Sequence, residues 1–193
     1  MPFQVTGKVR AGRLTALMGP SGAGKSTLLH ALCGKLPHTK GDVEVNSSST
    51  NSGRKSSRGL TMQQLRKLVG FVPQDDTLLG DLTVKETLRL HASLRLPTHV
   101  YTATREAWVD DVIDLLGLTD VKHAVVGNEK TRGISGGQKK RVNIGVELVS
   151  DPSILFLDEP TSGLGAWKSL FAWRAHGLNY FKCLTTFKLK KIT

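Results

Sequence analysis

Residues 19–27 carry the pattern most able to do chemistry: their sequence, GPSGAGKST, fits the phosphate-binding P-loop G-x-x-x-x-G-K-[S/T]. Glycine can adopt backbone dihedrals that other residues avoid, so successive N–H groups of such a loop can converge on an anion. Lys25 adds a cation for the β- and γ-phosphates, and the Ser26 hydroxyl is a hard oxygen ligand suited to Mg²⁺. A helix beginning near Lys25 adds the positive end of its dipole. We expect phosphate contacts from Gly19, Pro20, Ser21, Gly22, Ala23, Gly24, Lys25, Ser26 and Thr27.

Two carboxylates stand at the end of an apolar run further along the chain. Residues 153–160 are SILFLDEP, which predicts a buried strand ending in Asp158 and Glu159. An acid at the tip of a parallel strand beside a P-loop commonly holds Mg²⁺ through water, and the next carboxylate can polarise an attacking water. We therefore expect Asp158 to serve a metal ion and Glu159 to act as a general base. A solvated strand end is the alternative, which the P-loop disfavours.

A side-chain amide stands at another strand end. Residues 68–76, LVGFVPQDD, predict an apolar strand that stops at a proline and places Gln74 at its terminus. Sites in α/β folds lie at such termini. Taken alone, this pattern does not identify a site.

A second glycine-rich segment precedes a helix. Residues 133–142, GISGGQKKRV, predict the start of a helix that runs to about Val149. Its N-terminus would present backbone N–H groups near Ser135, Gly136, Gly137 and Gln138, which makes it a second candidate for anion binding. A capped helix with a flexible entry loop accounts for the same residues equally well, and both interpretations stay open.

The elements that must position these residues alternate between strand and helix, which favours an α/β fold. Further elements are expected as strands at 13–18 and 41–45 and helices at 26–33, 63–68 and 106–116. Residues 46–58 are serine-rich and predict a solvated loop. From about 81 to 126 the pattern is helical, and Thr83 and Glu86 have the spacing of a capping box.

Composition bounds the class of protein. The 193 residues are 39% hydrophobic, which suits one α/β domain, and no apolar run approaches the roughly 18 residues that span a bilayer. The first 13 residues lack the apolar core of a signal peptide. Cys33 and Cys183 are interpreted as free thiols of a reducing compartment. More than half of the net charge of +11 lies in residues 166–193, which hold six Lys/Arg and no Asp or Glu, so a basic nucleic-acid-binding protein ranks last.

In this order, the motifs resemble those of the nucleotide-binding domain of ABC transporters. Residues 19–27 match the Walker A motif, Gln74 the Q-loop, 134–138 the signature motif and 154–158 the Walker B motif, with Glu159 in the catalytic-base position.

The exact sequences of three motifs resemble one subfamily of these transporters. VPQDD at 72–76, SGGQKKR at 135–141 and DEPTSGL at 158–164 look like the white-type half-transporters of the G subfamily. The resemblance covers about residues 5–164.

The resemblance implies a fold and residue roles. The fold is a P-loop NTPase core of ABC type, with a small antiparallel β part around the P-loop and a helical insertion at about 81–147. ATP and Mg²⁺ are the expected cofactors. Ser26, Gln74 and Asp158 are then expected to serve the metal, and Gln74 and Glu159 to take part in catalysis.

The resemblance also implies partners. Two such domains meet head to tail, and residues 135–138 of one contact the ATP bound to Walker A of the other. Closure and hydrolysis drive attached membrane domains. The chain is therefore expected at the cytosolic face of a membrane, held by a transmembrane domain outside this sequence, with no nucleic acid as partner.

Two departures from the family pattern lie towards the end of the chain. The family places Asp after residues 162–164 and a histidine roughly thirty residues after Walker B, whereas this chain has Gly165 and no histidine at the second place. We therefore expect an ATP-binding domain over 1–165 that is truncated, an unmatched basic tail over 166–193, and ATP binding with slow hydrolysis. The rivals are a nucleotide-binding module without turnover and a soluble ABC protein acting on nucleic acid or ribosomes. The second rival usually carries two cassettes or long coiled coils, and neither is present.

Overall fold

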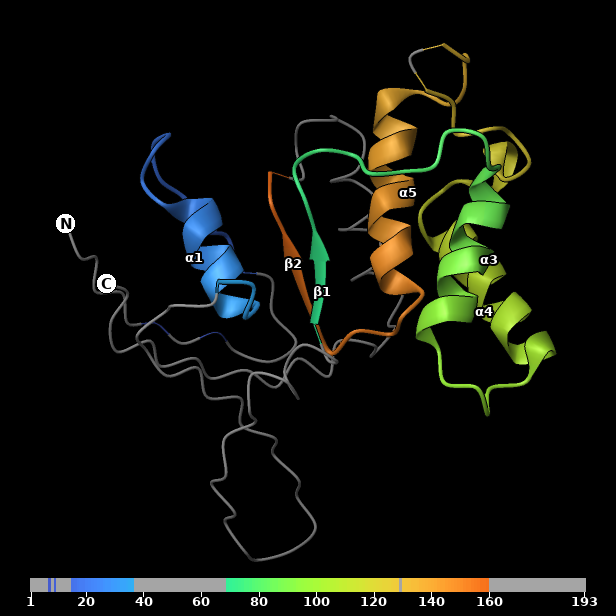
Figure 1. Ribbon diagram of the computed structural model, residues 1–193, viewed down its shortest axis with the longest axis horizontal. Coiled ribbons are helices and arrows are strands. Elements are labelled where there is room, and N and C mark those ends of the chain that lie inside the picture. Colours follow the sequence, from blue (N-terminus) through green and yellow to red (C-terminus); the bar gives the residue numbers. More distant parts are fainter. Residues whose placement is uncertain (1–6, 8, 10–14, 37–68, 129, 160–193) are drawn as a thin grey trace, which may run out of the picture. The chain divides into compact units, whose positions relative to one another are not determined.

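The computed structural model describes residues 7, 9, 15–36, 69–128 and 130–159. The helices and strands in these ranges are, in chain order, α1 (Lys25–Leu32), β1 (Val69–Val72), α3 (Val84–Arg95), α4 (Thr102–Leu115), the 3₁₀ helix η1 (Thr119–Val121), α5 (Gly136–Leu148) and β2 (Ile154–Leu157) (Figure 1). The described residues fall into two compact units, one that ends at Val69 and one that begins at Gly70.

In the first unit, the P-loop leads directly into α1. The helix begins at Lys25, as expected to within one residue, and its N-cap Gly24 takes the left-handed conformation (φ 83°), which glycine adopts readily. Ala31, Leu32 and Cys33 are buried at its C-terminal end. The prediction of a strand at 13–18 is wrong for residues 15–18, which have no regular secondary structure; residues 13 and 14 lie outside the described residues. Met18 is 88% exposed there, so this stretch lacks the packing that a core strand requires.

The second unit contains a parallel pair of strands, β1 and β2. Their side chains alternate between faces, and Val72 and Ile154 are among the buried residues. The strands expected within residues 68–76 and 153–160 are thus confirmed, and they end at Val72, just before the proline, and at Leu157, just before the two carboxylates. Of the antiparallel part expected around the P-loop, residues 41–45 and most of 1–13 lie outside the described residues.

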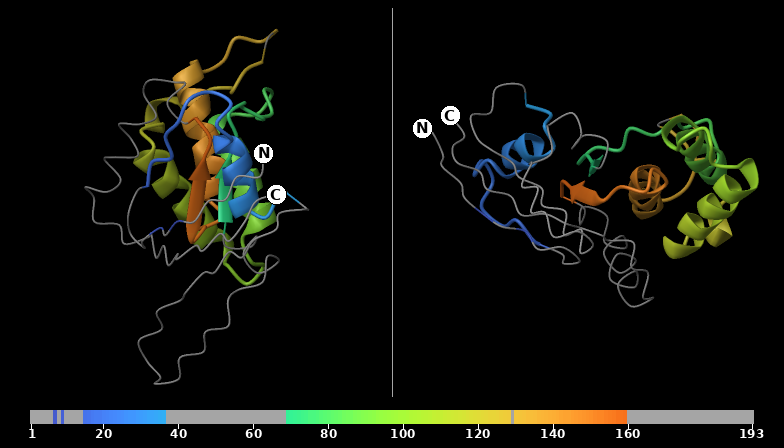
Figure 2. Two further views of the ribbon diagram at one scale, coloured as in Figure 1. Left: turned by 90° about the vertical axis from the view of Figure 1, so that its left-hand side faces the viewer. Right: turned by 90° about the horizontal axis from the view of Figure 1, so that it is seen from below.

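Helix α5 lies between the two strands and the pair formed by α3 and α4 (Figures 1 and 2). A helix covered on two sides needs apolar residues around most of its circumference, and seven of its residues are buried, Lys140 and Asn143 included. Gly145 allows α3 and α4 to approach, because a Cβ there would lie 2.9 Å from Leu88 and from Leu116 side-chain carbons.

The helical region expected from about residue 81 is confirmed in α3, α4 and η1. Helix α3 begins at the expected capping box, in which Thr83 and Glu86 bond each other's backbone N–H groups. An isolated antiparallel bridge joins Thr83 to Val125 and closes this region on itself. Among the described residues, no helix is both long and apolar enough to cross a membrane.

Candidate functional site

The P-loop presents a cation and an uncapped helix N-terminus. Gly22 and Gly24 have φ of 78° and 83°, which L-residues with a side chain rarely adopt, and an added Cβ at either would meet no heavy atom within 4 Å. The Lys25 ammonium folds back over the loop and donates to the carbonyls of Gly19 (2.9 Å) and Pro20 (2.8 Å). The first turn of α1 holds no acidic residue. This donor set fits a phosphate, because it offers positive charge and open space without a competing carboxylate.

The other predicted loop residues are exposed where they stand. Ser21 and Ala23 lie before the helix, and the hydroxyl-bearing Ser26 and Thr27 lie in its first turn. All of these belong to the first unit, whereas the remaining predicted site residues belong to the second.

In the second unit, the carboxyl ends of β1 and β2 bring three predicted residues together. The backbone N–H of Asp158 donates to the carbonyl of Val72 (3.0 Å), which extends the pairing beyond the two strands. Two residues past β1, the Gln74 amide Nε2 donates to Glu159 Oε2 (2.9 Å). The Asp158 residue is 8% exposed. Residues 85 positions apart in the sequence therefore meet because parallel strands end at the same edge of their sheet.

Glu159 has an unusual backbone. Its φ of 46° lies in the left-handed region, which is unfavourable for residues other than glycine. Interactions with the surrounding structure must offset this cost in free energy. Glu159 lies two positions past β2, and its carboxylate accepts the hydrogen bond from the Gln74 amide.

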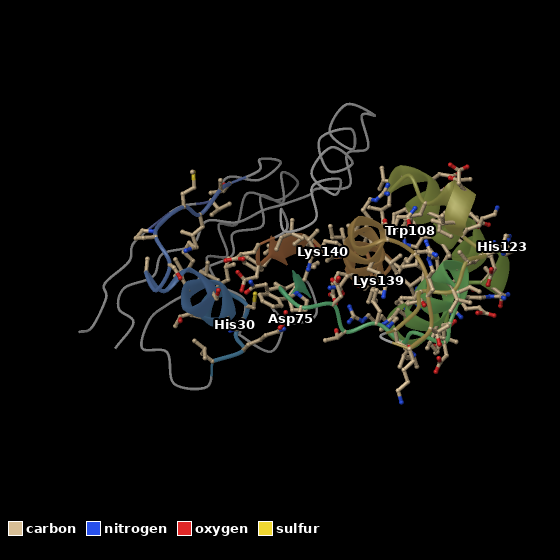
Figure 3. The ribbon with its side chains drawn as sticks, turned by 90° about the horizontal axis from the view of Figure 1, so that it is seen from above. His30, Asp75, Trp108, His123, Lys139 and Lys140 are labelled. Atoms are coloured by element: carbon tan, nitrogen blue, oxygen red, sulfur yellow. The ribbon has the colours of Figure 1, made fainter. Side chains whose placement is uncertain are left out.

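The segment after β1 is held by α5. The Lys140 side chain reaches from α5 towards the strand ends (Figure 3) and donates to the carbonyls of Pro73 (3.2 Å) and Gln74 (2.6 Å). Its Nζ also lies 3.1 Å from Asp76 Oδ1, which accepts a bond from Asn143 Nδ2 at 3.1 Å.

These contacts on α5 were missed from the sequence. Within the run Lys139–Arg141, nothing local distinguishes the one lysine that is buried. One sequence signal could have indicated these contacts: the polar residues 140, 143 and 147 are spaced so that they share one face of α5.

Glu147 ties three elements together. Its carboxylate accepts two bonds from the Arg95 guanidinium on α3, at 2.7 and 2.9 Å, and one from the Phe71 N–H on β1 at 3.2 Å. This carboxylate links the helical region to the strand that leads to Gln74.

The second glycine-rich segment forms a capped helix. The Ser135 hydroxyl accepts from the Gln138 N–H (3.3 Å), and the Gln138 side chain accepts from the Ser135 N–H (2.8 Å). Gly136 and Gly137 stand in the first turn with no heavy atom within 4 Å of an added Cβ. The cap of the expected helix is confirmed, whereas the flexible entry loop and anion binding at this helix end stay predictions.

The remaining predictions concern residues that are not described. The loop at 46–58, the helix at 63–68, Gly165 and the basic tail at 166–193 all lie outside the described residues.

Comparison with known proteins gives the family. The family model described as ABC transporter matches residues 3–162. The chain is 47% identical over 171 residues to "ABC transporter G family member 28" of Arabidopsis thaliana, covering 89% of this chain and 15% of that protein. It is also 47% identical over 165 residues to "Probable ATP-dependent permease" of Saccharomyces cerevisiae, covering 84% of this chain and 15% of that protein.

The family match implies a P-loop NTPase fold, and the described residues form helices and a small parallel sheet. The chain belongs to the ABC transporter family: it is an ATP-binding domain homologous to those of G-subfamily transporters. It spans about 15% of the length of the two relatives just described. ATP binding, and ATPase activity in general, are properties of this family.

Proposed function

We propose that this domain binds MgATP and, in the intact transporter, couples ATP hydrolysis to transport across a membrane. The observation that carries the proposal is the hydrogen bond between Gln74 and Glu159 at the carboxyl ends of adjacent strands. It joins a candidate metal ligand to a candidate general base. Neither motif alone predicts such a pair.

Each proposed role follows from the chemistry of the side chain. Lys25 and the P-loop N–H groups bind the phosphates, for which Lys25 must leave the carbonyls of Gly19 and Pro20. The Ser26 hydroxyl, the Gln74 amide oxygen and the Asp158 carboxylate supply the hard oxygen ligands that Mg²⁺ prefers. When bound, the metal would neutralise charge that develops on the phosphates.

Glu159 is the proposed general base. Its carboxylate accepts a hydrogen bond from the Gln74 amide, which orients it without neutralising its charge. From that position it can accept a proton from a water that attacks the terminal phosphate.

The proposed partners come from the family. Residues 135–138 would contact ATP held by the P-loop of a second ABC domain, which makes the functional unit a pair. A transmembrane domain would hold that pair at the cytosolic face of a membrane. Within the chain, we propose residues 1–165 as the ABC domain, with the helical insertion at about 81–147, an antiparallel β part around the P-loop, and 166–193 as a separate tail.

Nucleotide titration tests the binding half of the proposal. Lys25→Ala removes a charge-assisted phosphate contact, so ATP affinity is expected to fall at least about tenfold. Lys35→Ala is the matched control, because it removes the same charge from the exposed residue just beyond α1. Equal affinities of the two variants for ATP would refute the P-loop assignment.

Phosphate release at saturating MgATP tests the hydrolytic half. Glu159→Gln keeps the shape of the side chain but cannot accept a proton, and a loss of about a hundredfold is expected with ATP affinity retained. Glu106→Gln, on α4, is the control for a carboxylate removed elsewhere. If the wild-type chain releases phosphate no faster than Glu159→Gln does, the hydrolytic half of the proposal is wrong and ATP binding alone remains.

A further inference from the structure

The least expected feature of the second unit is a lysine in its interior. Lys140 is 3% exposed, although an ammonium loses much of its hydration free energy when it is buried. Burial of this kind requires that each N–H donor finds an acceptor. Lys140 meets three acceptors, namely the carbonyls of Pro73 and Gln74 and the carboxylate of Asp76.

All three acceptors lie in one short segment. Residues 73–76 follow β1 directly and carry Gln74, so the charge of α5 acts on the backbone from which the Gln74 side chain extends. Asn143, one turn further along α5 and 4% exposed, binds the same Asp76 carboxylate. Helix α5 thus binds the segment 73–76 at its first two carbonyls and at its last side chain, and the Gln74 amide donates to Glu159.

We propose that Lys140 is a positioning residue: it holds the segment 73–76 so that the Gln74 side chain meets Glu159. The proposal rests on the function proposed above for Gln74 and Glu159, and it adds a residue that acts on them from α5. Lys140 does not touch the nucleotide in this account. It acts through the backbone of Gln74, where its contact of 2.6 Å is the shortest of the three.

Hydrogen exchange tests the positioning role without nucleotide. Lys140→Met keeps most of the length of the side chain but removes all three contacts. The Asp158 amide donates to the carbonyl of Val72 directly before the held segment (3.0 Å), so this amide is expected to exchange at least about tenfold faster. Arg141→Met is the matched control, because Arg141 also donates to three main-chain carbonyls, those of Leu116 and Gly117 (3.0 Å each) and Gly137 (3.4 Å), but has no bond to residues 73–76. Unchanged exchange at the Asp158 amide in Lys140→Met, or equal acceleration in both variants, overturns the proposal.

A double-mutant cycle tests whether Lys140 acts through Gln74. The readout is the factor by which Mg²⁺ raises ATP affinity. Lys140→Met and Gln74→Ala are each expected to reduce that factor severalfold, and the double variant no further than Gln74→Ala alone. Independent, additive losses overturn positioning through Gln74. If Gln74→Ala leaves the factor unchanged, the proposed metal role of Gln74 fails instead, and hydrogen exchange still decides whether Lys140 holds the segment.

Discussion

Removing the Glu147 carboxylate is expected to destabilise the second unit more than removing any other paired carboxylate on its helices. The Phe71 N–H belongs to a residue that is 7% exposed, and loss of its acceptor costs about 1–3 kcal/mol. The Arg95 ion pair is partly exposed, at 38% and 13% for the two side chains, and adds about 1 kcal/mol. Glu147→Ala should therefore lower the free energy of unfolding by about 2–4 kcal/mol.

Urea unfolding of three variants separates the two contributions. Glu147→Gln retains a carbonyl oxygen for the Phe71 N–H and loses only the charge, so its loss should be about 1 kcal/mol. Glu106→Ala breaks the Arg89 ion pair between α4 and α3, whose side chains are 26% and 55% exposed, and should lose less than about 1 kcal/mol. The reasoning is refuted if Glu147→Ala loses no more than Glu147→Gln, because the buried N–H would then have contributed nothing.

Thr83→Ala removes the capping box that Thr83 forms with Glu86 and should lower the unfolding free energy by about 1 kcal/mol, seen as a fall of a few degrees in Tm. Gly133→Ala places a Cβ 2.2 Å from the backbone oxygen of Val126, and the forced shift should cost up to about 3 kcal/mol in urea unfolding. Burial raises the pKa of the Cys33 thiol from 9.0 to about 12. Alkylation at pH 8, followed by peptide mapping, should therefore be much slower at Cys33 in the folded chain than in urea. The unfolded thiol ionises at a lower pH than the folded one. The free energy of unfolding should therefore fall as the pH rises from about 9 towards about 12.

What the sequence determined by itself is local. The glycines of the P-loop, the capping boxes at Thr83 and Ser135, and the helices that follow them depend on neighbours within four residues, so their pattern could be recognised along the chain. The apolar runs of β1 and β2 were recognisable for the same reason. The family resemblance assigned roles to Gln74, Asp158 and Glu159 before any contact between them was known.

Only the tertiary structure decided which of these residues meet. The Gln74–Glu159 bond depends on β1 and β2 being neighbours, which no pattern within either strand specifies. Likewise, Lys139, Lys140 and Arg141 are alike in sequence, but rotation of about 100° per residue around α5 turns Lys140 towards the strand ends. Lys140 is buried there because carbonyls from a segment about 66 residues away replace its lost water, a compensation that exists only once both elements are packed.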